Sequence, residues 1–307
     1  ICACLVGSEM CIRDSIKWDS FNVGGSATVN FNGPKVDGGY HTLNYVNGGN
    51  VSQIYGTINA YNNGNIYIVN PAGVQIGNSA QINVGSLYVS NAKIDNIDGY
   101  KGQQEPDIIS IMKKSQRTNA ELMSLGNINA TKVTFEGNGR IVIDSERIKN
   151  EDVKLGADNI IVKTNSKDNV VIGYEAYDED KKSYADVENG NLVTLNENGD
   201  YITKADGYMW VEDVEQLQAI NTYLKGNYAL RNSIDATSTE QNGFISIGLN
   251  GNNEIQNEGK GFTGNFDGIE YNIFGLNITG NNNAGLFGYT DGCLLYTSPS
   301  PRDMRRS

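Results

Sequence analysis

The chain has 307 residues and a formal net charge of −12, from 24 Lys plus Arg and 36 Asp plus Glu. This balance argues against nucleic acid and against a polybasic membrane surface, since both need clustered basic side chains. No apolar run is long enough to span a bilayer, and 36 glycines with 5 prolines are typical of many tight turns between short strands.

The two ends of the chain differ from the rest. Back-translation of Cys4–Asp14, reverse-complemented and read in a shifted frame, gives Cys293–Asp303 residue for residue. This relation resembles a sequencing adapter translated at both ends of an assembled fragment, so we expect 1–15 and 293–307 to be artefacts and the real protein to continue. The ends hold all four cysteines, which leaves 16–292 with no disulfide framework and no cysteine metal site.

Residues 16–45 are expected to form short strands near one end of a solenoid. An open solenoid end exposes core and unpaired backbone, so we interpret Trp18 and Phe21 as cap residues. His41 is the single histidine of the chain. Without cysteines or acids beside it, we expect a solvated loop residue and not a metal ligand or general base.

Residues 65–90 predict strand, turn, strand, turn, strand. Apolar residues alternate within short runs, the period of a strand with one buried face: Ile66, Ile68, Val74, Ile76, Ile82, Val84, Leu87 and Val89. Between the first two runs lies Asn70-Pro71-Ala72-Gly73, whose Asn, Pro and Gly suit a type I turn. Three strands with polar corners and no helix between them indicate stacked β-solenoid coils.

An internal repeat supports the same interpretation. Gly56-Thr-Ile-Asn-Ala60 recurs as Gly126-Asn-Ile-Asn-Ala130, with a weaker copy at 80–84. Coils that share one register should stack Ile58, Ile82 and Ile128 inside. Asparagines at equivalent positions could then form hydrogen-bonded ladders from coil to coil.

Two stretches interrupt the solenoid pattern. Residues 95–121 are interpreted as an insertion, with one or two helical turns at Asp107–Lys114; strands resume within 133–162. Residues 166–207 are polar and charged, with hairpin signals at Asn189-Gly190 and Asn198-Gly199, and we place a boundary there. The acidic run 178–180 lacks the spacing of a calcium loop and is expected to be a solvated loop.

Residues 208–292 are expected to form a second module. Trp210–Ile220 has apolar residues at helical spacing and acids in its first turns, which predicts a short amphipathic helix. Glycine- and aromatic-rich segments follow, ending in Gly285-Leu-Phe-Gly288. These segments resemble the GLUG-type repeats of bacterial surface and adhesin proteins.

A second resemblance covers about residues 16–165. It is carried by Trp18, Phe21–Gly24, Val29 with Phe31, Leu43-Asn44-x-Val46, Ser52–Ala60 and the segment 65–90. These motifs are similar to the secretion domain of two-partner-secretion exoproteins of the filamentous haemagglutinin type. The chain departs from that family in two places: Asn70–Gly73 replaces Asn-Pro-Asn-Gly, and Tyr45 stands where a basic residue is usual.

The resemblance implies a fold and a domain plan. The fold is all-β, a right-handed parallel β-helix (β-solenoid) with an N-terminal cap and small insertions. The secretion domain would occupy 16–165, a polar connecting region 166–207 and the GLUG-like module 208–292.

The resemblance also implies a function. The chain would be the N-terminal part of a large secreted surface adhesin of a bacterium with an outer membrane. Its partner would be an outer-membrane barrel transporter with POTRA domains, while host-cell or bacterial surface glycans or proteins would be bound by a further C-terminal region. Asn70, Pro71, Ala72 and Gly73 are the candidate transporter-recognition residues, and the alternative is that they form only a supporting turn.

Catalytic motifs are not evident in 16–292. It contains no nucleophile elbow, phosphate-binding glycine loop or His-Glu metal motif, so we expect no catalytic residues, no metal and no cofactor. Parallel β-helices do include polysaccharide-cleaving enzymes, whose sites need paired acids with basic partners. A polysaccharide-active enzyme, or a secreted cytolysin or contact-dependent toxin, are therefore the alternatives to an adhesin.

Overall fold

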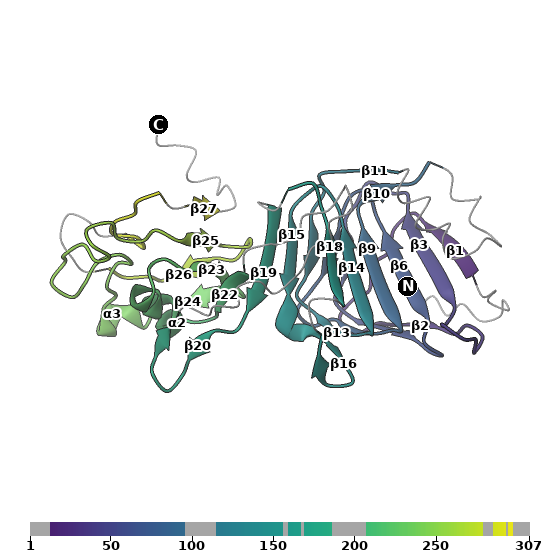
Figure 1. The fold of residues 1–307 in the computed structure, drawn as a ribbon, viewed down its shortest axis with the longest axis horizontal. Coiled ribbons are helices and arrows are strands. Elements are labelled where there is room, and N and C mark those ends of the chain that lie inside the picture. Colours follow the sequence, from purple (N-terminus) through teal and green to yellow (C-terminus); the bar gives the residue numbers. More distant parts are fainter. Residues whose placement is uncertain are drawn as a thin grey trace. The chain divides into compact units, whose positions relative to one another are not determined.

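A computed structural model describes residues 13–95, 115–155, 159–166, 169–185, 207–278, 285–292 and 294–296. Within these residues two compact units can be separated, the first ending at Ile172 and the second beginning at Gly173. Both consist mainly of strands, drawn as arrows in Figure 1.

Three parallel sheets make up the described part of the first unit. Sheet A has the order β1 (Arg13–Trp18), β3 (His41–Val46), β6 (Asn65–Val69), β9 (Ser86–Ser90), β14 (Lys132–Glu136), β18 (Ile160–Lys163). Sheet B contains β4 (Ser52–Ile54), β7 (Val74–Ile76), β12 (Leu122–Ser124) and β15 (Ile141–Asp144). Sheet C contains β2 (Thr28–Phe31), β5 (Thr57–Ala60), β8 (Gln81–Asn83), β13 (Asn127–Asn129) and β16 (Ile148–Asn150), with β17 (Val153–Lys154) antiparallel to β16.

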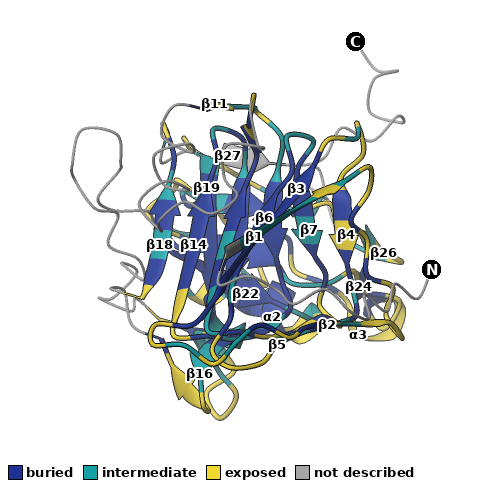
Figure 2. Cartoon of the chain, turned by 90° about the vertical axis from the view of Figure 1, so that its right-hand side faces the viewer, coloured by how far each residue is buried: buried dark blue, intermediate teal, exposed yellow. Residues whose placement is uncertain are grey.

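Successive strands visit the three sheets in turn. β3 lies in sheet A, β4 in sheet B and β5 in sheet C, before β6 returns to sheet A and pairs in parallel with β3. Figure 2 shows β3 and β6, β4 and β7, and β2 and β5 on different sides of the unit. The chain is therefore a parallel β-helix, which confirms the predicted fold class.

Aliphatic side chains fill the interior of this helix. All eight alternating residues predicted for 65–90 are buried and belong to one core cluster. Ile82 pairs in register with Ile58 on one side and Ile128 on the other, and all three are fully buried. Identical side chains in one register can be buried with the same backbone geometry in each coil. The internal repeat predicts this stack.

The N-terminal end of the helix carries the two predicted cap residues. Phe21 is buried, and the ring of Trp18 packs 5.2 Å from it between centroids. Trp18 Nε1 donates to Asn44 Oδ1 at 3.1 Å, so the polar end of the indole also has a partner.

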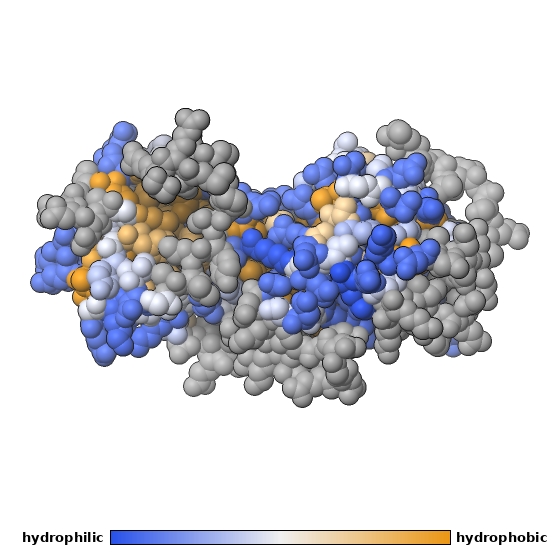
Figure 3. All heavy atoms as spheres, turned by 90° about the horizontal axis from the view of Figure 1, so that it is seen from above, coloured by the Kyte–Doolittle hydropathy of each residue, from blue (hydrophilic) through white to orange (hydrophobic). Residues whose placement is uncertain are grey.

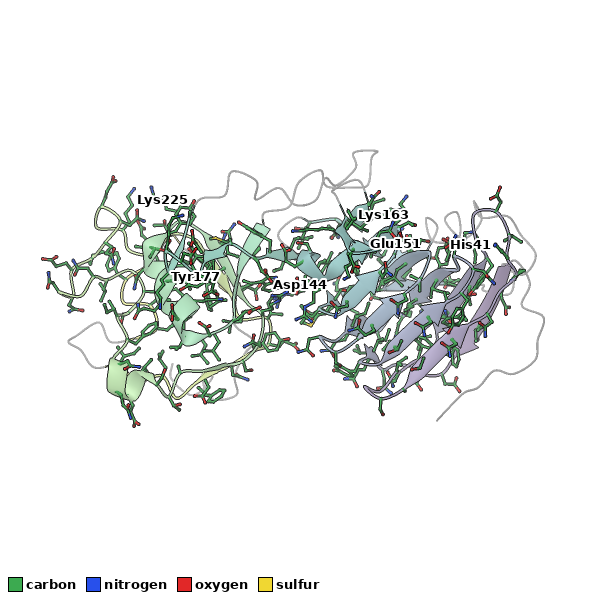
Figure 4. All side chains as sticks on the ribbon, turned by 90° about the horizontal axis from the view of Figure 1, so that it is seen from below. His41, Asp144, Glu151, Lys163, Tyr177 and Lys225 are labelled. Atoms are coloured by element: carbon green, nitrogen blue, oxygen red, sulfur yellow. The ribbon has the colours of Figure 1, made fainter. Side chains whose placement is uncertain are left out.

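The prediction for His41 is wrong. It lies within β3, where 6% of its surface is exposed, and its Nδ1 is 3.2 Å from Tyr67 Oη (Figure 4 labels His41). The reason is that the outward face of sheet A is itself covered. A second apolar cluster forms there, made of Leu43, Tyr45, Tyr67, Val69, Ala92 and Ile94.

The predicted insertion is described only at its two ends. β10 (Ala92–Lys93) and β11 (Gln116–Arg117) pair antiparallel. The helical turns expected at 107–114 lie outside the described residues.

A buried carboxylate caps the short helical segment that follows β15. Asp144 ends β15 and caps the 3₁₀ segment η2 (Ser145–Arg147), because its Oδ1 accepts from Glu146 N at 3.1 Å. Its other oxygen lies 3.1 Å from Arg147 Nε, so the buried carboxylate is paired. β19 (Val170–Tyr174) contains the residues at which the two units divide.

The second unit combines parallel strands with short helices. Its parallel pairs are β22 (Gly207–Val211) with β23 (Asn227–Leu230), β23 with β25 (Asn265–Asp267), β25 with β27 (Leu294–Tyr296), and β24 (Ile234–Asp235) with β26 (Ile273–Phe274). β20 (Tyr177–Asp178) and β21 (Ser183–Tyr184) form a hairpin. The helical segments are α2 (Val214–Ala219), η4 (Ile220–Thr222) and α3 (Thr239–Asn242).

The helix predicted at 210–220 begins later than expected. Trp210 and Val211 complete the buried strand β22, and Asp213 then caps α2 by accepting from Gln216 N at 2.8 Å. Gln216 Oε1 in turn accepts from Glu212 N, the residue before the cap, so two hydrogen bonds join the start of the helix to the segment before it. The predicted hairpin signals at 189–190 and 198–199 lie outside the described residues.

A series of aromatic rings in contact runs through the interior of the second unit. Tyr184 packs edge-on against Tyr228 at 5.0 Å, Tyr228 lies 6.2 Å from Phe262, and Phe262 lies 5.0 Å from Phe287. Figure 3 shows apolar side chains, in orange, on the upper face of this unit as well.

Candidate functional site

The predicted recognition residues form the turn between β6 and β7. Gly73 N donates to Asn70 O at 2.9 Å, which closes the four-residue turn, and Asn70 N donates to Ser90 O of the following coil at 2.9 Å. The chain passes here from sheet A to sheet B. The predicted turn is confirmed, and all four residues are brought together.

The side chain of Asn70 is wholly engaged in structure. It is fully buried, and its Nδ2 donates to Asn50 O and to Ser52 Oγ, both at 2.9 Å. Its Oδ1 accepts from Ala72 N at 2.9 Å. Both amide hydrogens are thus donated to the preceding coil while the oxygen shapes the turn, so Asn70 fixes the turn onto its neighbour.

Gly73 is required by backbone geometry. Its φ of +106° is rarely adopted by residues with a side chain, and a Cβ atom there would lie 2.6 Å from Glu121 O. Its carbonyl also accepts from Ser52 N at 3.1 Å. Glycine therefore lets three chain segments meet at the end of the turn.

Pro71 and Ala72 supply the exposed surface of the turn. Both are half-buried, whereas Asn70 and Gly73 are buried. Pro71 O accepts from Thr118 Oγ1 at 2.7 Å, which ties the end of the insertion to the turn. A partner that contacts the folded turn would meet Pro71 and Ala72, and the turn forms although Ala72 replaces the asparagine usual in the family.

Tyr45, the second departure from the family pattern, lies in the apolar cluster outside sheet A. It is 3% exposed, and burial raises the pKa of its phenol, with a smaller opposing effect from a hydrogen bond to the backbone of Ile94. A basic side chain at this buried position would need a partner.

A charged cluster that sequence reasoning missed lies beside it on sheet A. Glu136 is 3% exposed, accepts from Tyr88 Oη and pairs with Arg117 of β11. Lys163 Nζ lies 5.6 Å from the centre of the Tyr88 ring (Figure 4 labels Lys163). Tyr88 and Arg117 thus hold the buried carboxylate, and through Arg117 this cluster anchors the returning end of the insertion.

The acidic run 178–180 forms the tip of the β20–β21 hairpin. Asp178 Oδ1 accepts from the backbone N atoms of Asp180 and Lys181, and its Oδ2 lies 2.7 Å from Lys181 Nζ. The ion pair and these hydrogen bonds lower the pKa of Asp178. Its oxygens are thus engaged in the turn.

Within the described ranges, no three His, Cys, Asp or Glu side chains are grouped so as to hold a metal ion. In the same ranges, no helix has the length and apolar character needed to cross a membrane.

Two comparisons with known proteins bear on this geometry. Residues 14–247 match a family model described as "TPS secretion domain". The chain is also 33% identical over 97 residues to the "Heme/hemopexin-binding protein" of Haemophilus influenzae (strain ATCC 51907 / DSM 11121 / KW20 / Rd). That alignment covers 30% of this chain and 10% of the relative, so the chain spans about a tenth of that protein's length. The family match points to a secreted exoprotein.

Proposed function

Since the chain belongs to the TPS secretion domain family, we propose that it is the transporter-recognised, fold-initiating part of a large secreted surface adhesin. Membership in this family implies a protein secreted by a bacterium with an outer membrane, together with a cognate outer-membrane transporter. The finer proposal is that the transporter's periplasmic POTRA domains recognise the chain while it is unfolded. Adhesion to host or bacterial surfaces would belong to later parts of the protein.

The single observation that carries the proposal is the family match over a stack of coils that contact their neighbours in register. In such a stack each new coil buries its apolar side chains against the coil before it. No ATP is available at the outer membrane, so free energy released coil by coil outside the cell could favour forward movement. The lack of cysteine in 16–292 would also prevent cross-links in the oxidising periplasm.

The domain plan belongs to the same proposal. We propose that residues 16–165 are the secretion domain that the transporter recognises, that 166–207 connect it to the next module, and that 208–292 form a GLUG-like module. Residues 1–15 and 293–307 would be translated adapter. The family match extends past 165 to residue 247. The adapter assignment is supported by the complementary back-translations of the two ends.

Export of residues 16–292 behind a Sec signal peptide, with and without a cognate transporter, is the test. Three turn variants separate recognition from folding. Asn70→Ala removes the buried hydrogen bonds, Pro71→Ala changes half-buried surface in a turn type that accepts most residues, and Ala72→Asn restores the usual family sequence. Each variant is also refolded, and its unfolding transition is measured.

We expect export only with the transporter, and we expect Pro71→Ala to reduce export while its unfolding transition stays close to that of the native chain. Equal export of all variants with native stability would limit these residues to a structural role. Export without any transporter would contradict the two-partner mechanism for this chain.

A further inference from the structure

One outward face of the first unit carries a regular array of amide and hydroxyl groups. We call it the amide face, and it consists of two rows on sheet C. Row one is Thr28, Thr57, Gln81 and Asn127; row two is Asn30, Asn59, Asn83 and Asn129. The residues between the rows, such as Ile58 and Ile82, point into the core, so both rows point outward.

The rows are regular because the strands pair in parallel without a shift. Each row therefore repeats at the strand spacing of about 4.8 Å, and the rows are two residues apart along each strand. All eight residues are exposed or half-buried. The lower side of the unit in Figure 2, where β2, β5 and β16 are labelled, shows where sheet C lies.

Hydrogen bonds hold three residues of row two in a ladder, and the fourth, Asn129, accepts from Glu151 N at 3.0 Å. Asn59 Nδ2 donates to Asn30 Oδ1 at 2.9 Å, and Asn83 Nδ2 donates to Asn59 Oδ1 at 2.9 Å. An amide has two donors and two acceptor lone pairs, so the ladder uses half of the capacity of Asn59. The remaining donor and acceptor belong to a half-buried side chain that the ladder already orders, which lowers the entropy cost of binding.

The amide face is neutral on an acidic protein. None of its eight residues is charged, whereas the chain as a whole carries −12. Lys149, the next residue in register after Asn129, is paired with Asp152 at 2.6 Å. A polyanion or polycation would find no complementary charge on these four strands, but a neutral ligand rich in hydroxyl groups would find donors and acceptors.

An exposed aromatic ring borders row two. Tyr61 follows Asn59 by two residues, and 52% of its surface is exposed. Its backbone N donates to Phe31 O at 3.1 Å, which holds this position against β2. A phenol ring next to hydrogen-bonding groups can stack on the apolar face of a sugar ring while its hydroxyl stays in water.

We propose that the amide face binds a neutral glycan chain laid across the strands, with its hydroxyl groups on the asparagine ladder and one sugar ring on Tyr61. The proposal rests on the adhesive role proposed above and extends it, since it names a ligand class and adds a site on this chain to the adhesive regions proposed for later parts of the protein. Binding by purified protein requires no export. Failure of glycan binding and failure of transporter-dependent secretion are therefore separate results.

The test is binding of the full 307-residue chain to cellohexaose, maltohexaose and chitohexaose, with a heparin hexasaccharide as the anionic probe. We expect at least one neutral hexasaccharide to bind with a Kd of about 1 mM or tighter. The affinity should change little with salt concentration, because no ion pairs form. Failure of all three neutral probes to bind overturns the proposal, as does preferential binding of heparin.

Variants locate the site. Asn59→Asp replaces a ladder donor by a charge, and Thr57→Val removes a hydroxyl while keeping a strand-favouring shape. We expect each, and Tyr61→Ala, to weaken binding by roughly tenfold, while Asn78→Asp on an exposed corner outside the face leaves binding unchanged. Unfolding transitions followed by Trp18 fluorescence identify any variant that fails to fold.

Equal binding by all four variants overturns the proposal. A regular array of amide and hydroxyl groups could also order water. If the native chain binds no hexasaccharide but changes the shape of growing ice crystals, the amide face orders water and the glycan proposal is wrong.

Discussion

In the first unit the interior is lined mainly by aliphatic side chains stacked in register, whereas the second unit buries, beside aliphatic side chains, a series of contacting aromatic rings. Ile58, Ile82 and Ile128 occupy one register position on three strands of sheet C. In the second unit Tyr228, Phe262 and Phe287 succeed one another at centroid distances of 5.0 to 6.2 Å. Both units use parallel strands, so the difference lies in how each coil fills its interior.

The spacing of coils accounts for this difference. In the first unit, Ile58 and Ile82 are separated by only 24 residues, and each coil is a thin layer of short strands. In the second unit, Met209 and Tyr228 pair across 19 residues but Asn227 and Asn265 pair across 38, so the length of chain in each turn varies. A less regular interior is filled better by large rings than by isoleucines stacked in one register.

The largest effect is expected in the aromatic core. Phe262 is fully buried between Tyr228 and Phe287, so Phe262→Ala should lower the free energy of unfolding of the second unit by about 3–5 kcal/mol. Trp210 reports on this unit in a Trp18→Phe background, because the chain has two tryptophans. Chemical denaturation followed by its fluorescence gives the value.

The same chain offers a matched control for this substitution. Phe274 is 50% exposed, so Phe274→Ala should change stability by no more than about 0.5 kcal/mol. Equal losses for the two phenylalanine variants would contradict an aromatic core centred on Phe262.

A somewhat smaller loss is expected in the aliphatic stack. Ile82→Ala leaves a cavity between Ile58 and Ile128 and should cost the first unit about 2–5 kcal/mol, measured by Trp18 fluorescence in a Trp210→Phe background. Val153→Ala, at a residue that is 68% exposed, serves as the control. If Ile82→Ala destabilised the chain no more than the control did, the stack would not be the core of this unit.

The aliphatic stack is also where sequence reasoning succeeds. A repeat of Ile at one register position and alternation within short runs are local patterns, and the inward side chains follow from them directly. The same local rule fails for His41 and Glu136, which occupy outward positions. They are buried because another segment of the chain covers sheet A, and no pattern within β3 or β14 records that contact.

The second unit shows the other source of error. The apolar spacing of Trp210–Ile220 fits a helix, but Trp210 and Val211 are placed in β22 by parallel pairing with β23. Asp213 then marks the true start of the helix as its cap. Cap chemistry was visible in the sequence, whereas the strand pairing depends on residues about 19 positions away.

An intermediate effect is expected at the turn of the first unit. Asn70→Ala removes the donors to Asn50 O and to Ser52 Oγ; Ser52 is buried, so the loss should cost about 1–3 kcal/mol. Ala72→Asn alters a half-buried side chain that makes no required contact and should leave stability nearly unchanged. If Asn70→Ala lowered the free energy of unfolding by no more than Ala72→Asn does, the buried amide of Asn70 would be dispensable for stability. Both free energies come from denaturation followed by Trp18 fluorescence in a Trp210→Phe background.

The smallest loss of stability at neutral pH is expected for a substitution of Tyr40, in the core of the first unit. Burial raises the pKa of its phenol from 10.0 to about 12, and Tyr40 Oη donates to Phe31 O at 2.7 Å. Because the pKa of the Tyr40 phenol is higher in the folded chain, this phenol ionises at a lower pH in the unfolded chain than in the folded one. The stability from this difference is complete below pH 10 and is lost as pH rises from about 10 to about 12.

Tyr40→Phe should therefore cost about 1 kcal/mol at pH 7, from the lost hydrogen bond, and should flatten the alkaline decline of the first unit between pH 10 and 12. In a Trp210→Phe background, Trp18 fluorescence isolates this unit, which matters because burial also raises the pKa values of Tyr184 and Tyr228 in the second unit. Tyr61→Phe, at an exposed position, is the matched control. An unchanged alkaline slope in Tyr40→Phe would mean that the first unit loses stability at high pH through other groups.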